Sequence, residues 1–173
     1  MKKINQAIEI EIDKLTNSIE NRITKDSFPT EILILDKSDL KHLTRKTGWL
    51  FNWKDEFLLP DRDVYKLTIS GNLSVIQGLV SLSEKSDHVY MHLIESAPFN
   101  RGLNKVYLGI PGNLVAFACK VSFQRGFEGY VSFVAKSQLI EHYVNTLGAY
   151  NVGGQLMVIN TQSALKLIDK YYK

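Results

Sequence analysis

The chain has 173 residues, a length that fits one domain able to bury a continuous core. It carries 21 basic and 18 acidic residues, a formal net charge of +3, and 45% of its residues are hydrophobic. This composition is that of a globular protein and excludes a disordered chain. The positive excess is small and scattered, which argues against a nucleic-acid-binding protein. We therefore expect a single domain over residues 1–173 with no nucleic-acid partner.

The only cysteine, Cys119, excludes an intramolecular disulfide framework and a multi-cysteine metal site. It lies in the apolar run 114–121, which predicts a buried structural thiol rather than a nucleophile. No charged-then-apolar leader opens the chain, and no apolar run approaches the length that spans a membrane. These observations predict a cytoplasmic protein with no metal and no membrane partner.

The first 25 residues carry isoleucine and leucine side chains at helical spacing: Ile8, Ile12, Leu15, Ile19 and Ile23. That spacing predicts an amphipathic N-terminal helix over residues 1–25, packed on the domain or on a partner. A homodimer built on this stripe is an open alternative. Because Ile8, Ile10 and Ile12 also alternate, a strand is the competing interpretation of those positions.

Residues 31–35 form a short apolar run that predicts the first strand. Ser38 is a good N-cap for a helix through about Lys46, because its hydroxyl can accept a hydrogen bond from a free backbone N–H. Gly48 ends that helix. Aromatic and apolar side chains then cluster over residues 49–57, as core packing or as the wall of a pocket.

Three strands follow in an antiparallel meander, at residues 65–69, 75–82 and 89–94, with turn residues between them. Gly78 lies inside the second strand and marks a bend or a close backbone approach.

The second half of the chain alternates helices and strands. We expect a helix from about Gly112 to Gln124, a buried strand over 129–134 and a helix over 138–147 that Gly148 closes. A hairpin turns at residues 153–154, and Thr161 caps a final helix over 161–173. A meander followed by these elements is a mixed α/β pattern without internal repeats.

Residues 108–118, with the sequence Leu-Gly-Ile-Pro-Gly-Asn-Leu-Val-Ala-Phe-Ala, resemble the acyl-CoA pyrophosphate loop and following helix of the GNAT superfamily. Residues 66–96 are similar to that family's meander, 129–135 to its fifth strand and 139–148 to the next helix. The resemblance covers residues 30–160. It implies an α/β (mixed α+β) fold with a central, mostly antiparallel, splayed sheet flanked by helices, here with extra N- and C-terminal helices. It also implies an N-acyltransferase that takes acetyl or another acyl group from acyl-CoA.

The resemblance places the cofactor at the loop and at the splayed strand. The residues it implies for acetyl-CoA are Leu108, Gly109, Ile110, Gly112, Asn113, Leu93 and Ile94. A helix N-terminus suits a pyrophosphate because its N–H groups are unpaired, and glycines let the backbone approach closely. Two positions depart from the family pattern. Val106 stands where the family has Gln or Arg, and Pro111 removes one N–H donor; Lys105 or Arg101 would then supply the positive charge.

Acyl transfer to an amine requires a base for the amine and a proton for the departing thiolate. Glu95 is the candidate base because it ends an otherwise apolar strand; a solvated strand-end glutamate is the alternative. The resemblance implies Tyr143 as the thiolate's proton donor, against a plain packing role. His92 and His142 are weaker candidates. Strand alternation puts His92 on the other face unless a bulge intervenes. The acceptor would be a small-molecule or protein amine. The alternative function is a GNAT-like module that binds CoA or a protein partner without transfer.

Overall fold

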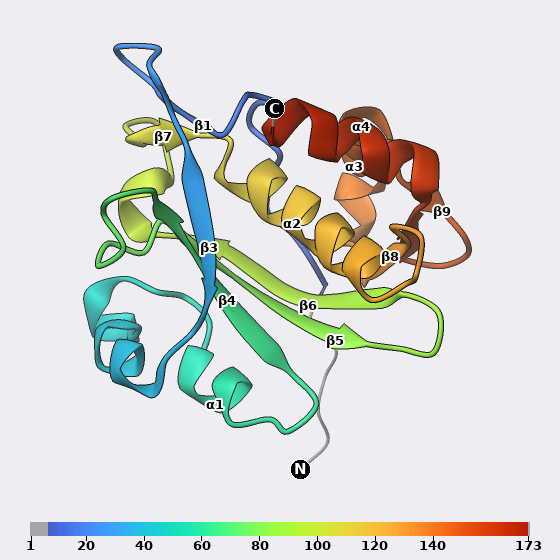
Figure 1. Ribbon diagram of the computed structural model, residues 1–173, viewed down its shortest axis with the longest axis horizontal. Helices are drawn as coiled ribbons and strands as arrows, with labels where there is room; N and C mark the ends of the chain where they lie inside the picture. The colour runs from blue at the N-terminus through green and yellow to red at the C-terminus, as the bar shows by residue number, and fades with distance from the viewer. Residues whose placement is uncertain (1–6, 173) are drawn as a thin grey trace.

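The computed structural model describes residues 7–172, and its main sheet has seven strands in the order β3-β4-β5-β6-β8-β10-β9 (Figure 1). These strands are β3 (Thr30–Ile34), β4 (Asp63–Ile69), β5 (Gly78–Glu84), β6 (Val89–Ser96), β8 (Val131–Val134), β9 (Tyr150–Asn151) and β10 (Leu156–Ile159). Every neighbouring pair is antiparallel except β6 and β8, which are parallel. The expected mixed α/β fold with a mostly antiparallel sheet is therefore confirmed.

The helices cover both faces of this sheet (Figure 1). They are α1 (Trp53–Phe57), α2 (Ile110–Gln124), α3 (Ile140–Leu147) and α4 (Thr161–Tyr171). One hydrophobic core lies between the sheet and α2, and a second, smaller core that includes Trp53 lies on the face toward α1. Helix α4 lies along α2. Within residues 7–172, each helix is too short or too polar to cross a membrane.

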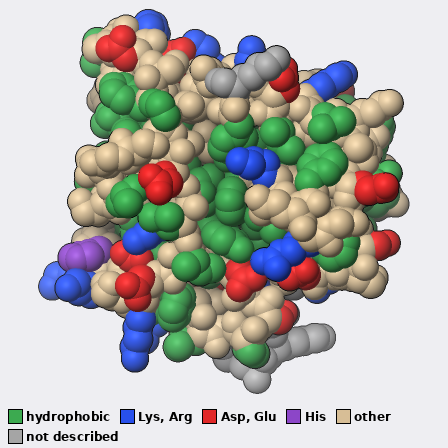
Figure 2. Space-filling view, viewed as in Figure 1, with side chains coloured by type: hydrophobic (Ala, Val, Ile, Leu, Met, Phe, Trp, Pro, Cys, Tyr) green, Lys and Arg blue, Asp and Glu red, His purple; other side chains and the backbone are tan. Residues whose placement is uncertain are grey.

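Hydrophobic side chains also reach the surface in Figure 2, where they gather at the middle of the viewed face, over the strands between β3 and α2. Ile32, Tyr65 and Phe117 are half-buried members of the core under α2, and the Tyr65 and Phe117 rings meet edge to face. Charged side chains of both signs are scattered around this area. The arrangement is that of a core whose rim is open to solvent.

The sheet parts between β6 and β8. The two strands are paired only at Val89–Val131 and Tyr90–Ser132. Beyond these pairs β6 contains a bulge at His92, because Ser81 lies opposite Leu93 while Leu82 lies opposite Met91. Strand β6 stays paired with β5 as far as Ser96 but leaves β8. The expected splay is thus present, and the bulge lets His92 reach Ser83, whose hydroxyl oxygen lies 2.7 Å from His92 Nε2.

The predicted N-terminal helix is wrong within the described residues. Residues 7–16 form no helix, a bend follows at residues 17–18, and β1 (Ile19–Asn21) then pairs with β2 (Ser27–Phe28) and β7 (Tyr107–Leu108). The helical stripe fails because its members do not share one environment: Ile8, Ile12 and Ile19 are buried, whereas Leu15 and Ile23 are exposed, Ile23 by 75%. The strand interpretation holds for Ile8, which forms a parallel bridge with Ala135. The expected helical residues 1–6 lie outside the described residues.

Two other helix starts also differ from the prediction. The segment expected as a helix from Ser38 is a pair of 3-10 turns, Lys37–His42 and Arg45–Thr47, and Asp36 caps the first of them through a capping box with Asp39. At α4 the cap is Asn160, whose side chain accepts from the Ser163 N–H, and Thr161 instead donates to the Glu128 carbonyl. The observed N-caps, Asp36 and Asn160, lie two residues and one residue before the predicted ones, Ser38 and Thr161. Asp and Asn are, like Ser and Thr, residue types that favour the N-cap position. Gly148 does close α3 in the left-handed conformation, with φ of 68°.

Gly78 provides a test of the packing under α2. A Cβ at this position would lie 2.6 Å from Ile110 Cγ2 and 3.2 Å from the Glu95 carbonyl oxygen. We expect Gly78→Ala to lower the free energy of unfolding by about 1–3 kcal/mol, because the overlap forces α2 away from β5. Denaturant unfolding measures the change. The exposed Ser74→Ala variant, which should stay within about 0.5 kcal/mol of the parent, is the control, and equal stability of the two variants would contradict the close approach.

Candidate active site

A cavity of about 550 Å³ lies in the splay of the sheet. One wall is the end of β6, with Leu93, Ile94 and Glu95, and the opposite wall is the extended segment 7–13. Leu50 and Phe51 close one side, Arg101 and Lys105 approach from the loop before α2, and Pro111 from the first turn of α2. The structure therefore brings together the expected strand residues and the two cations, and Pro111 is the one residue of the segment 108–113 that lines the cavity.

Glu95 is held by three N–H donors. Its carboxylate accepts from Leu50 N at 2.7 Å, Phe51 N at 3.2 Å and Trp53 Nε1 at 2.8 Å. The side chain is buried, and Arg101 Nη1 lies 3.5 Å from Oε2. Charge-assisted hydrogen bonds of this kind are the stronger class in proteins. Glu95 thus fastens the aromatic segment 50–53 to the end of β6, and it is not a solvated strand-end residue.

The aromatic cluster serves both of the purposes that the sequence left open. Trp49 and Trp53 are buried in the smaller core, with Trp53 completely inaccessible. Leu50 and Phe51 instead line the cavity. Arg101 supports the same segment, because its guanidinium donates to the Gly48 carbonyl. One short stretch of chain therefore supplies core packing and a cavity wall together.

The loop before α2 binds a carboxylate. Gly109 is the N-cap of α2, with a φ of 92° that favours glycine. Its N–H donates to Asp13 Oδ1 at 3.0 Å, and Lys105 Nζ lies 3.0 Å from Asp13 Oδ2. A negative charge at a helix N-terminus is favourable because of the free N–H groups and the helix dipole. In this structure the loop therefore holds the chain's own carboxylate, with Lys105 as its positive partner.

The other residues expected at the cofactor build the loop instead of lining the cavity. Leu108 lies in β7, paired with Glu20, and Ile110 is buried in the core under α2. Gly112 faces Tyr171 so closely that a Cβ would lie 1.8 Å from the Tyr171 hydroxyl oxygen. The Asn113 side chain donates to the Ser18 carbonyl at 3.1 Å. Their part in cofactor binding stays a prediction.

Tyr143 lies on α3, buried behind the segment 7–13 that lines the cavity. Its ring packs edge to face on Phe133, and its hydroxyl donates to the Ile10 carbonyl at 2.5 Å. Burial, and secondarily the negative charges of Glu11 and Glu9, raise the pKa of Tyr143 well above the usual range. The phenol therefore stays protonated at neutral pH, and in this structure its proton is donated to the Ile10 carbonyl.

Sequence reasoning missed one residue of the site, Asp13. Its pairing with the loop more than ninety residues away carries no local signal. His142, a weaker candidate from the sequence, accepts from Ile12 N at Nε2 at 2.8 Å, beside the Tyr143 contact. The one signal that could have found this segment was the alternation of Ile8, Ile10 and Ile12. Within residues 7–172, no group of His, Cys, Asp or Glu side chains has the arrangement of a metal site.

Solved structures with the same fold are acetyltransferases. A mutant form of the spermidine/spermine N-acetyltransferase SpeG from Vibrio cholerae is 14% identical, with a TM-score of 0.53 over 79% of this chain and 96% of that one. A mutant AtaT toxin bound to the C-terminus of the antitoxin AtaR and acetyl-CoA is 16% identical, with a TM-score of 0.52 over 80% and 98%. The KacTA–DNA complex is 15% identical, with a TM-score of 0.54 over 81% and 98%. The chain has the GNAT fold.

The likeness is one of structure alone. No protein-family model matches the chain, and no curated protein matches its sequence. The substrate, partner and DNA in these structures belong to those proteins.

The contacts of Glu95 predict a large effect on stability. Glu95→Gln puts an amide NH₂ among three N–H donors, so at least one buried donor loses its acceptor. We expect the free energy of unfolding to fall by about 2–3 kcal/mol. Unfolding followed by tryptophan fluorescence measures it, because Trp53 contacts the carboxylate. Glu31→Gln, an exposed change on β3, is the matched control, and a Glu95 variant as stable as this control would show that the carboxylate is dispensable.

Proposed function

We propose that the protein is an N-acyltransferase that moves an acyl group from acyl-CoA to an amine. The observation that carries the proposal is the pairing of an anion-binding helix N-terminus, at Gly109 and Lys105, with a splayed sheet that encloses a cavity. The acetyltransferases with the same fold support it. Acetyl-CoA is the acyl-CoA for which we propose the first test.

In this proposal each part of the site has a separate task. Gly109 N–H and Lys105 hold the pyrophosphate, because both already bind a carboxylate. Leu93 and Ile94 lie where β6 has left β8, and in the proposal this strand edge faces the amides and the thioester carbonyl of acyl-CoA. Acyl-CoA supplies an activated acyl group and a thiolate leaving group.

Tyr143 is the proposed proton donor to the thiolate. Its hydroxyl meets the Ile10 carbonyl of the segment that lines the cavity, and it is protonated at neutral pH, as a proton donor must be. Glu95 positions the segment 50–53 that bounds the cavity. Its role as the base that takes the amine's proton stays a prediction.

A second candidate is a GNAT-like module that binds CoA or a protein partner without transfer. Two observations favour it. Pro111 stands in the first turn of α2 and cannot donate an N–H to a phosphate. The Tyr143 hydroxyl, moreover, is already engaged by the chain's own Ile10 carbonyl.

Release of free thiol from acetyl-CoA separates the two candidates. The chain's only cysteine, Cys119, is buried, and burial raises the pKa of its thiol to about 12. We therefore expect it to react slowly with a thiol reagent, and the thiol signal of the protein without acetyl-CoA is subtracted. Release that depends on one amine from a panel supports the enzyme, whereas acetyl-CoA that raises the melting temperature without thiol release supports the module.

Tyr143→Phe tests the proposed proton donor. The ring and its contact with Phe133 remain, and only the hydroxyl is lost. We expect turnover to fall about tenfold or more, on the scale usual for a general acid, while the secondary structure seen by circular dichroism is unchanged. Tyr130→Phe, a change at a partly exposed tyrosine outside the splay, is the control. Turnover of the Tyr143 variant at the parent's rate would reduce Tyr143 to packing.

A further inference from the structure

The segment of residues 7–18, here called the N-terminal arm, crosses the splay and continues to the loop before α2. Figure 1 shows this part of the chain passing behind α2 toward the end of α4. It forms no helix, and Ile8, Ile12 and Thr16 are buried. It forms a wall of the cavity and contacts both ends of the proposed acyl-CoA site.

The start of the arm takes the edge of β8 that β6 has left. Ile8 N donates to the Val134 carbonyl at 2.6 Å, and Lys136 N donates to the Ile8 carbonyl at 3.0 Å. These are the hydrogen bonds of a parallel strand, and they continue the β6–β8 ladder after the strands part. Glu9 adds an ion pair with Lys136 at 2.5 Å.

The middle of the arm engages the groups of α3 that face it. The Ile10 carbonyl accepts from the Tyr143 hydroxyl, and Ile12 N donates to His142 Nε2. A phenol hydroxyl has one proton to donate. Tyr143 therefore cannot serve the arm and a departing thiolate at the same time.

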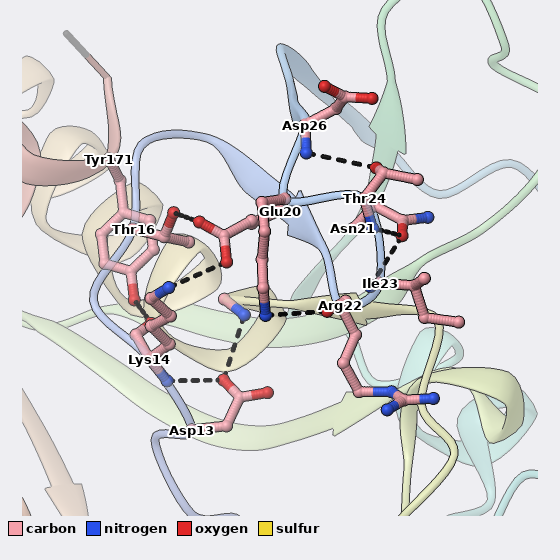
Figure 3. Close-up of polar contacts among 12 residues, drawn as sticks. Asp13, Lys14, Thr16, Glu20, Asn21, Arg22, Ile23, Thr24, Asp26 and Tyr171 are labelled. Atoms are coloured by element: carbon pink, nitrogen blue, oxygen red, sulfur yellow. Dashed lines mark hydrogen bonds and ion pairs between the residues drawn. The ribbon is translucent and has the colours of Figure 1, made fainter.

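The end of the arm places a carboxylate on the anion-binding loop. The Asp13 carboxylate accepts from the Gly109 N–H and pairs with the Lys105 ammonium, and the Asp13 side chain is 13% exposed. Figure 3 shows Asp13 and Lys14 beside Tyr171, whose hydroxyl donates to the Lys14 carbonyl at 2.6 Å. The loop that we propose for the pyrophosphate is therefore occupied by an anion of the chain itself.

We propose that the N-terminal arm occupies the acyl-CoA site and that acyl-CoA and the arm bind there in competition. This inference rests on the proposed function. The arm presents a backbone carbonyl to Tyr143 and one carboxylate to Gly109 and Lys105. In acyl-CoA the thioester end and the pyrophosphate would need the same three donors, so we infer that the cofactor binds only when the arm leaves.

The competition weakens the apparent affinity for acyl-CoA. The observed dissociation constant is the intrinsic one divided by the fraction of molecules whose arm is released. Arm release in turn exposes backbone amides that are bonded in the closed state, among them those of Ile8 and Ile12. Hydrogen exchange of these amides measures arm release without reference to activity.

The experiment combines hydrogen exchange with titration of acetyl-CoA, on the full chain. Saturating acetyl-CoA should speed exchange in peptides that cover residues 7–16. Asp13→Asn removes the charge on the loop and Ile8→Ala removes a buried side chain, so each should speed exchange in the arm and tighten acetyl-CoA binding by about tenfold. Ile8→Ala is included because it changes no charge near the proposed pyrophosphate site, so tighter binding in this variant would come from release of the arm alone. Asp26→Asn, at an exposed position between β1 and β2, makes the same charge change as the first variant and should alter neither measurement.

The outcomes separate this proposal from the proposed function. Faster exchange with acetyl-CoA and tighter binding by both arm variants support the competition. Binding of acetyl-CoA with unchanged exchange in the arm, and equal affinity in the Ile8→Ala variant, overturns the competition and leaves the acyl-CoA site standing. If both variants release the arm and neither they nor the parent binds acetyl-CoA, the proposed cofactor is wrong and the competition falls with it.

Discussion

The parting of β6 from β8 is the constraint on which the rest of the site depends. Two strands that separate leave backbone donors and acceptors along both inner edges, and buried groups of this kind are almost always satisfied. Here the edge of β8 is satisfied by Ile8, while β6 keeps its other edge on β5. The cavity, the direction of Tyr143 and the path of the arm all follow from that division. The bulge at His92 lies where the division begins.

Two carboxylates have different tasks in this arrangement. Glu95 is buried, accepts from N–H donors of a neighbouring segment and fixes the wall of the cavity. Asp13 is only partly buried and lies on a helix N-terminus and a lysine, the pairing that we propose another anion replaces. The Glu95 contact lies against the smaller core, whereas the Asp13 contact joins the N-terminal arm to the loop before α2. The difference between a structural and an exchangeable charge here is one of context, not of chemistry.

Much of the fold could be predicted from local signals. The meander, the helix that begins beside Gly109 and Pro111, and the left-handed cap at Gly148 are set by alternation and by turn residues close in the chain, and the structure confirms them. The arm could not be predicted, because its isoleucines fit a helical stripe as well as a strand, and only tertiary contacts decide between the two. Those contacts reach Val134, Tyr143 and Gly109, all more than ninety residues away. For the same reason the sequence identified the residues of the loop but not the carboxylate that binds to it.

The partners of the arm also bear on the order in which the molecule is completed during synthesis. The arm is made first, yet the Ile10–Tyr143 contact spans 133 residues and the Lys14–Tyr171 contact spans 157. Since domains form as the chain emerges, the meander and α2 can assemble on the ribosome before α3 and α4 offer either contact. Asp13 can already bind Gly109 and Lys105 at that stage, because both residues lie ahead of α2. The start of the arm docks last, because its partners Val134 and Tyr143 follow α2 in the chain.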